Sequence, residues 1–226
     1  AIKDVQLYKG SMPAQFGGRL ASVLDIRMKD GNDRKLGVSG SIGTISSNLT
    51  IEGPIKKNKA SFIIAARRTY ADVFLKLYSD PGIRNNKLYF YDLNAKVNVD
   101  AGPKDKLFLS GYFGRDVVGL GTTLGIDWGN ATGTARWNHI YAPRWFSNTS
   151  FIFSNYNYGV AFKTDAQDFS ITSVVRDLNL THELSFYPTP GSKWKVGFSS
   201  IRHTITPGRW DPAGHRASMP SRSRTN

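Results

Sequence analysis

Polar and apolar residues alternate along most of this chain with a period of two. The clearest case is residues 88–100, where Tyr89, Tyr91, Leu93, Ala95, Val97 and Val99 alternate with Asp92, Asn94, Lys96 and Asn98. Residues 174–186 repeat the pattern, and there Leu178, Leu180, Leu184 and Phe186 alternate with Asp177, Asn179, Thr181 and Glu183. Successive side chains of a strand point to opposite sides, so both segments predict strands between an apolar and an aqueous medium.

The alternation begins near residue 36 and predicts an all-β, antiparallel fold of about nine or ten strands. Residues 130–141 and 194–199 alternate clearly, whereas 61–68 and 145–159 are assigned to strands from their context. The predicted strands have about ten residues or more, against about 5 to 6 in globular proteins. A tilted strand that crosses a bilayer needs about 9 to 11 residues, so their length favours a transmembrane β-barrel.

The connections between these strands predict that the two ends of the sheet differ. Short turns are expected at Gly53-Pro54, Gly102-Pro103, Ala142-Pro143 and Pro188–Gly191. Longer connections are expected near residues 69–86, 115–129 and 160–169. Consecutive connections of an antiparallel meander leave from opposite ends, and short turns facing long loops are typical of outer-membrane barrels. A soluble β-sandwich gives no reason to shorten the loops on one side only.

Aromatic residues gather near the ends of the predicted strands, as in the girdles of membrane barrels. They are Tyr89, Tyr91, Trp137, Tyr141, Trp145, Phe146, Phe186, Tyr187 and Trp194. The mean hydropathy of −0.34 also suits a barrel, because half of each strand would face a wet interior. No apolar run approaches the ~18 to 20 residues of a membrane helix.

Charge and motif content argue against several other functions. The chain has no cysteine, which excludes disulfides and thiolate metal ligands. Its net charge of +13 is thinly spread, which favours a solvated surface over nucleic-acid binding. His139, His182, His203 and His215 lack metal-ligand spacing, and no nucleotide-binding motif is present. We therefore predict no enzyme activity, no metal site, no cofactor and no nucleic-acid partner.

Residues 1–31 follow a different pattern, in which "IKDVQLYKG" predicts a strand, "SMPAQFGG" a loop and "RLASVLDIRMKDGN" a second strand. This block resembles the end of the plug domain in TonB-dependent outer-membrane receptors, through Val5–Gly10, Pro13–Arg19 and Ser22–Ile26. "GSIGTISSNLTIEGPI" and "SFIIAARRTYADVF" resemble the first three barrel strands of that family, and "RWNHIY" resembles a later one. The resemblance covers roughly residues 3–205.

The resemblance implies a plug that closes the barrel interior and leads directly into the first barrel strand. Residues 1–33 would end the plug, 34–205 would form the first part of the barrel, and 206–226 would be an irregular tail. Gly17 and Gly18 would permit a turn, and Arg19 would bind a carboxylate or carbonyl inside the barrel. The residues expected to line the water-filled interior are Asp92, Asn94, Lys96, Asn98, Asp177, Asn179, Thr181 and Glu183.

The function implied is import of a large or scarce solute through a plugged barrel in the outer membrane of a Gram-negative bacterium. Barrels of this family have about 22 strands, so nine or ten strands would leave an open sheet. We therefore expect the chain to be a piece of a longer protein. Its expected partners are outer-membrane lipid, the TonB energy-coupling complex through a missing N-terminal part, and a surface lipoprotein.

Two other functions stay open at this point. One is a passive outer-membrane pore or an assembly barrel, neither of which would carry a plug. The other is a soluble, basic β-sheet module that binds a partner. The plug-like residues 1–31 argue against the first, and the length of the strands argues against the second.

Overall fold

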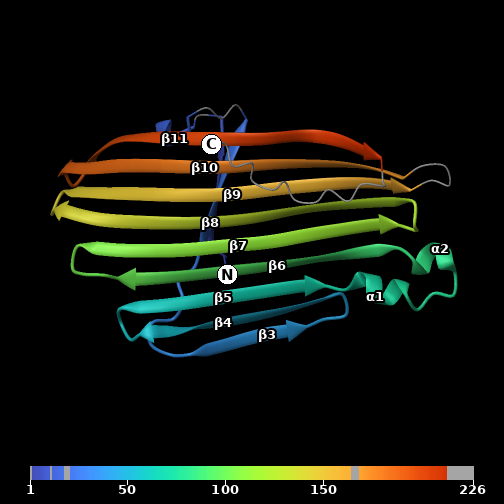
Figure 1. Cartoon of the computed structure of the whole chain (residues 1–226). Coiled ribbons are helices and arrows are strands. Elements are labelled where there is room, and N and C mark those ends of the chain that lie inside the picture. Colours follow the sequence, from blue (N-terminus) through green and yellow to red (C-terminus); the bar gives the residue numbers. More distant parts are fainter. Residues whose placement is uncertain (1, 11, 18–20, 164–167, 213–226) are drawn as a thin grey trace, which may run out of the picture.

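The structure is a computed structural model that describes residues 2–10, 12–17, 21–163 and 168–212. Over this part of the chain it contains eleven β-strands, two short α-helices and one 3-10 turn (Figure 1). Neither of these helices is long and apolar enough to cross a membrane. The protein is therefore all-β, as the period-two alternation predicts.

The first two strands form a separate hairpin. Strand β1 (Ile2–Lys9) pairs in antiparallel register with β2 (Ser22–Met28), and the 3-10 turn η1 (Ala14–Phe16) lies between them. Val5 stands opposite Ile26 and Leu7 opposite Leu24, so the hairpin has one mainly apolar side. The strand–loop–strand arrangement predicted for residues 1–31 is confirmed.

The other nine strands form one antiparallel sheet whose spatial order follows the sequence. They are β3 (Gly37–Ile42), β4 (Ser46–Lys56), β5 (Ala60–Thr69), β6 (Lys87–Asp100), β7 (Asp105–Leu120), β8 (Leu124–Ala142), β9 (Trp145–Lys163), β10 (Asp168–Thr189) and β11 (Ser192–Pro212). Strands β3 and β11 are its two edges and do not pair with each other, so the sheet is open. This confirms the predicted strand number and the predicted lack of closure.

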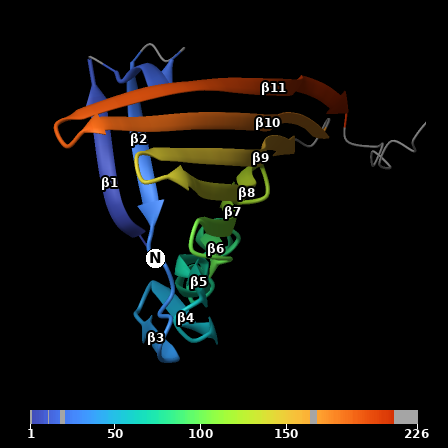
Figure 2. The ribbon, with the colours of Figure 1, turned by 90° about the vertical axis from the view of Figure 1, so that its left-hand side faces the viewer.

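The pairing register gives the sheet two distinct faces. On one face, Asn98 of β6 stands opposite Ser61 of β5 and Phe108 of β7. We call this the hairpin face, because Ser61 and neighbouring side chains contact the segment that follows β2. Figure 2 shows the β1–β2 hairpin beside this face, with β10 and β11 reaching across above it. The opposite side, which carries Val97, is called the outer face.

The turns at one end of the sheet agree with the prediction except for the first. Residues 101–104, 143–144 and 190–191 connect β6 to β7, β8 to β9 and β10 to β11, as expected. The turn predicted at Gly53-Pro54 is wrong, because both residues lie within β4. The chain instead reverses at residues 57–59, where Asn58 has a φ of 55°. Asparagine tolerates this left-handed conformation, and a register shift after Pro54 accommodates the proline.

Of the long connections expected at the other end, one is confirmed, one is much shorter, and one is only partly described. Residues 70–86 do form a long connection, with helices α1 (Ala71–Leu75) and α2 (Pro81–Arg84). The loop expected at 115–129 is wrong, because β7 and β8 fill it except for a three-residue turn at 121–123. Of the loop expected at 160–169, residues 160–163 lie in β9 and residues 168–169 in β10, and residues 164–167 lie outside the described residues. Strands β6 to β11 have 14 to 22 residues. Their hydrogen-bonded pairing therefore continues into segments in which polar and apolar residues no longer alternate.

The prediction of an irregular tail from residue 206 is wrong as far as Pro212, because β11 continues to that residue. Pro207 falls at a register shift between the pairs formed by Thr172 and Val174 of β10. A proline is tolerated there because β11 is an edge strand, whose outer backbone groups face no neighbouring strand. Residues 213–226 lie outside the described residues.

Candidate functional site: the two faces of the sheet

The segment between β2 and β3 crosses the hairpin face in direct contact with β5. The Ser61 hydroxyl donates a hydrogen bond of 2.8 Å to the carbonyl oxygen of Gly31 and also contacts the Asn98 side chain. Ser61 and Ile63 are fully buried. A Cβ atom added at Gly31 would collide with the backbone carbonyl of Phe62, so only glycine allows this close approach.

Ion pairs hold the same segment on the sheet. The Lys96 ammonium lies 2.7 Å from Asp30 Oδ1 and donates to the carbonyl oxygen of Met28 at 3.0 Å. The Lys96 side chain is only 10% exposed, so water screens its side of this contact weakly. Lys29 pairs with Glu52 at 3.1 Å on the neighbouring strand. We call Asp30, Gly31, Ser61 and Lys96 the anchor.

The anchor predicts that Lys96 restrains residues 28–33. In Lys96→Met, amide hydrogen exchange of this segment should become about tenfold faster. The reason is that a hydrogen bond to a charged group contributes ~1.5 kcal/mol or more to stability. Lys106→Met is the matched control, since Lys106 pairs with Asp100 at 3.2 Å and is 58% exposed. Equal exchange of residues 28–33 in the two variants would show that Lys96 does not hold the segment.

All eight residues expected to line the barrel interior lie on the hairpin face, as the continuous register from β6 to β10 requires. Three of them form pairs with a neighbouring strand: Asp92 with Arg67 at 2.8 Å, Asp177 with His203 at 2.7 Å, and Glu183 with Lys195 at 2.9 Å. Asn94 contacts Asp92, and Asn179 and Thr181 contact each other. Lys96 belongs to the anchor and Asn98 contacts it. This face is therefore polar and internally hydrogen-bonded. That it lines a water-filled interior stays a prediction.

The glycine–arginine motif is only partly described. Gly18 and Arg19 lie outside the described residues. Gly17 has a φ of −53°, which any residue can adopt, so this position does not need the freedom of glycine. Gly10, which directly follows β1, has a φ of 78° and does need it. Next to the motif, Gln15 accepts a hydrogen bond of 2.9 Å from Lys195 on β11.

The outer face carries a band of exposed apolar side chains across β6 to β11. Each of them is at least 40% exposed: Leu93, Leu107, Leu109, Phe113, Phe151, Phe153, Leu178, Leu180, Val196 and Phe198. His182 lies within the band, and its ring nitrogen contacts Thr149 Oγ1 at 2.9 Å. We call this surface the apolar band. A continuous apolar surface over six strands marks a contact with a membrane or with another protein.

One border of the apolar band is aromatic. Trp145 stacks on Phe186 with 4.2 Å between ring centroids, and Phe186 meets Trp194 edge to face. Beside them, the Trp137 indole donates to Asp105 at 2.8 Å, and the His139 ring lies 2.6 Å from the same carboxylate. Trp145, Phe186 and Trp194, which the sequence predicts near strand ends, are thus in contact with one another. Rings with one apolar and one hydrogen-bonded end suit a boundary between apolar and aqueous media.

The other border of the apolar band is basic. Four arginines lie on the outer face at this side of the apolar band: Arg68 on β5, Arg115 on β7, Arg176 on β10 and Arg202 on β11. Arg115 pairs with Asp127 at 2.6 Å, and Arg176 donates to Asn155 at 3.1 Å. On β10 the apolar band runs from Leu178, next to the basic border, to Phe186 in the aromatic border. This stretch measures about 26 Å along the strand at ~3.3 Å per residue.

Neither the anchor nor the basic border is visible in the sequence. Lys96 and Asp30 are 66 positions apart, and no motif links them. The arginines of the border are likewise scattered, and only the register brings them to one edge. No protein-family model, curated protein or solved structure matched this chain when it was compared with known proteins.

Proposed function

We propose that the nine-stranded sheet is part of the wall of a transmembrane barrel in a bacterial outer membrane. The observation that carries this proposal is the apolar band, with an aromatic border on one side and a basic border on the other. An outward apolar band about 25 Å tall, flanked by aromatic residues, is the physical requirement for a barrel in a bilayer. The strands exceed the ~9 to 11 residues that a tilted crossing needs, so their polar ends would extend into water.

We propose further that the β1–β2 hairpin and the anchor are the end of a plug that occupies the barrel interior. The hydrogen bonds of Ser61 and Lys96 support this, because they tie the segment after β2 to the polar face of the sheet. The hydrogen bond from Lys195 on the edge strand β11 to Gln15 also supports it, because it connects the loop of the hairpin to the same face. A passive pore has no need of a segment held across its interior.

The resulting function is that of a TonB-dependent receptor, which imports a large or scarce solute when energy relayed from the inner membrane displaces the plug. The unpaired edges of β3 and β11 support membership of a larger barrel, because exposed edges of this length otherwise promote aggregation. Contact with the TonB complex, with the solute and with a surface lipoprotein would lie in other parts of the parent protein.

Spin labels at neighbouring positions test the orientation of the wall. The chain has no cysteine, so Leu109→Cys and Ser110→Cys each give a single labelling site. Leu109 is 57% exposed in the apolar band, whereas Ser110 stands opposite Lys96 on the hairpin face. In lipid bilayers, the label at 109 should collide mainly with apolar oxygen and the label at 110 mainly with a water-soluble nickel complex.

The comparison of the two labels is decisive because they differ by one position in β7. If the label at 109 were as accessible to the nickel complex as the label at 110, the outer face would be in water. The soluble β-sheet module would then be the better interpretation of this chain.

A further inference from the structure

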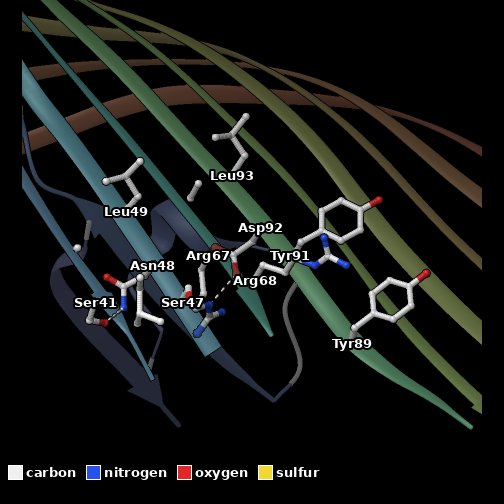
Figure 3. A pocket seen from close by; sticks show the side chains of 13 residues that line it. Ser41, Ser47, Asn48, Leu49, Arg67, Arg68, Tyr89, Tyr91, Asp92 and Leu93 are labelled. Carbon is white, nitrogen blue, oxygen red and sulfur yellow. Dashed lines mark hydrogen bonds and ion pairs between the residues drawn. The ribbon is translucent and has the colours of Figure 1, made fainter. Parts of the chain in front are cut away.

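A hollow of about 1120 Å³ lies on the sheet where the apolar band meets its basic border, over β3 to β6 (Figure 3). Leu49, Ala66 and Leu93, which are aligned by the register on the outer face, form its apolar part. Arg68 and Tyr91 line the adjoining polar part. The hollow therefore offers an apolar surface and a positive charge side by side.

The register places a second arginine, Arg115, on the same face, one strand beyond the hollow. Tyr91 on β6 stands directly opposite Arg68 on β5 and directly opposite Arg115 on β7. The two arginine backbones are therefore two strand spacings apart, or about 9.6 Å. In the structure the Arg115 side chain turns to β8, on the other side of β7 from Tyr91, where it pairs with Asp127. Both side chains of this pair are exposed, so the pair is weak, and Arg115 is long enough to exchange Asp127 for an anion above Tyr91.

The two arginines differ in how they are held. The Arg115 side chain pairs with Asp127 of β8 at 2.6 Å. The Arg68 side chain is exposed and makes no hydrogen bond or ion pair with the described part of the chain. Figure 3 shows its side chain running toward Tyr91, whereas the adjacent Arg67 is joined to Asp92. Arg68 is thus a free donor group at the edge of an apolar surface.

From this arrangement we propose that Arg68 binds the phosphate headgroup of an anionic membrane lipid, with Leu49 and Leu93 under its acyl chains. Arg115 joins the phosphate when it exchanges Asp127 for it. Guanidinium groups bind phosphate oxygens through paired, charge-assisted hydrogen bonds. Tyrosine suits the level of lipid headgroups because its ring is apolar and its hydroxyl is polar. A free anion would gain nothing from the leucines, and an apolar molecule would gain nothing from the arginines.

The proposal rests on the proposed function, since it requires the outer face to contact lipid. Its test uses a water-soluble lipid, so that the result does not depend on insertion into a bilayer. Dihexanoyl phosphatidic acid should bind to the full chain in non-ionic detergent, with saturable changes in the tyrosine NMR signals. Arg68→Gln should weaken this binding about tenfold, because it removes a charge-assisted partner of the phosphate. Arg115→Gln should weaken it less, by about threefold, because Arg115 must leave Asp127 to reach the phosphate.

Arg67→Gln is the matched control for Arg68→Gln. It removes the same charge from the neighbouring residue. Arg67 and Asp92 also border the hollow, but the Arg67 side chain points to the hairpin face, where it pairs with Asp92. Binding in this variant should remain within about twofold of that of the unchanged chain. An equal loss of binding in Arg67→Gln and Arg68→Gln would overturn the proposal, because only net charge would then matter.

Two other ligands separate the contributions of phosphate and acyl chains. Inorganic phosphate should bind at least tenfold more weakly than the lipid, because it cannot use the apolar surface. Dihexanoyl phosphatidylcholine should also bind more weakly, because its headgroup has no net charge. If either ligand matched phosphatidic acid, the lipid site would be ruled out. The membrane wall would still stand if the labels at 109 and 110 behaved as expected.

Discussion

Val97→Arg is expected to prevent most of the chain from assembling in a membrane. Val97 lies on the outer face of β6, opposite Phe62 and Leu109, in the middle of the apolar band. An arginine on the lipid-facing side of a barrel costs ~2 to 4 kcal/mol near the midplane, because its charge must leave water. The folded fraction can be measured from heat-modifiable electrophoretic mobility after refolding into lipid vesicles.

Asn94→Arg is the control, since it introduces the same side chain three positions away on the hairpin face. Asn94 lies beside Asp92, whose carboxylate can pair with the new arginine. Asn98 is less suitable for this purpose, because it contacts Ser61 in the most buried part of the sheet. Similar folded fractions for Val97→Arg and Asn94→Arg would contradict the assignment of the outer face to lipid.

Gly31→Ala is expected to detach the segment that follows the hairpin. The added methyl group would collide with the backbone carbonyl of Phe62, which is fixed by the ladders on both sides of β5. To avoid the collision, the chain must give up the hydrogen bond from Ser61 and the ion pair with Lys96. Overpacking of this kind costs about 1 to 3 kcal/mol. Hydrogen exchange should show faster opening of residues 22–33 while the central strands stay protected.

Gly133→Ala provides the comparison for this substitution. Gly133 lies in β8, and an added Cβ there would have no atom within 4 Å. Its substitution should leave exchange unchanged or slow it slightly, because alanine loses less conformational freedom on folding than glycine does. If amide hydrogen exchange of residues 22–33 were no faster in Gly31→Ala than in Gly133→Ala, the contact between Gly31 and Phe62 would not attach the segment to the sheet.

The sequence by itself determined which segments are strands and which way their side chains point. Residues 88–100 and 174–186 show why, because alternation with a period of two is a local property that needs no partner strand. The assignment of Asp92 and Asp177 to one sheet face follows from that alternation once the strands pair. The number of strands in the large sheet could be predicted for the same reason, whereas the hairpin of residues 1–31 and the openness of the sheet were not predicted from this alternation.

Strand ends were less predictable, because pairing with a neighbour can extend a strand whose own pattern has ended. Residues 115–129 have polar side chains on both faces, yet the ladder between β7 and β8 runs through them to a three-residue turn. Pro207 suggests a break, but β11 is an edge strand and shifts its register there. Gly53-Pro54 suggests a turn, but the chain reverses at Asn58.

Only the tertiary structure decided which distant residues meet. Lys96 and Asp30 form an ion pair because the segment after β2 crosses the sheet where Gly31 can approach the Phe62 carbonyl. Arg68 and Arg115 flank Tyr91 because three strands pair in one particular register, which a shift of one residue would destroy. Alternation sets the face of each side chain, whereas its neighbours across the sheet depend on pairing between strands far apart in the sequence.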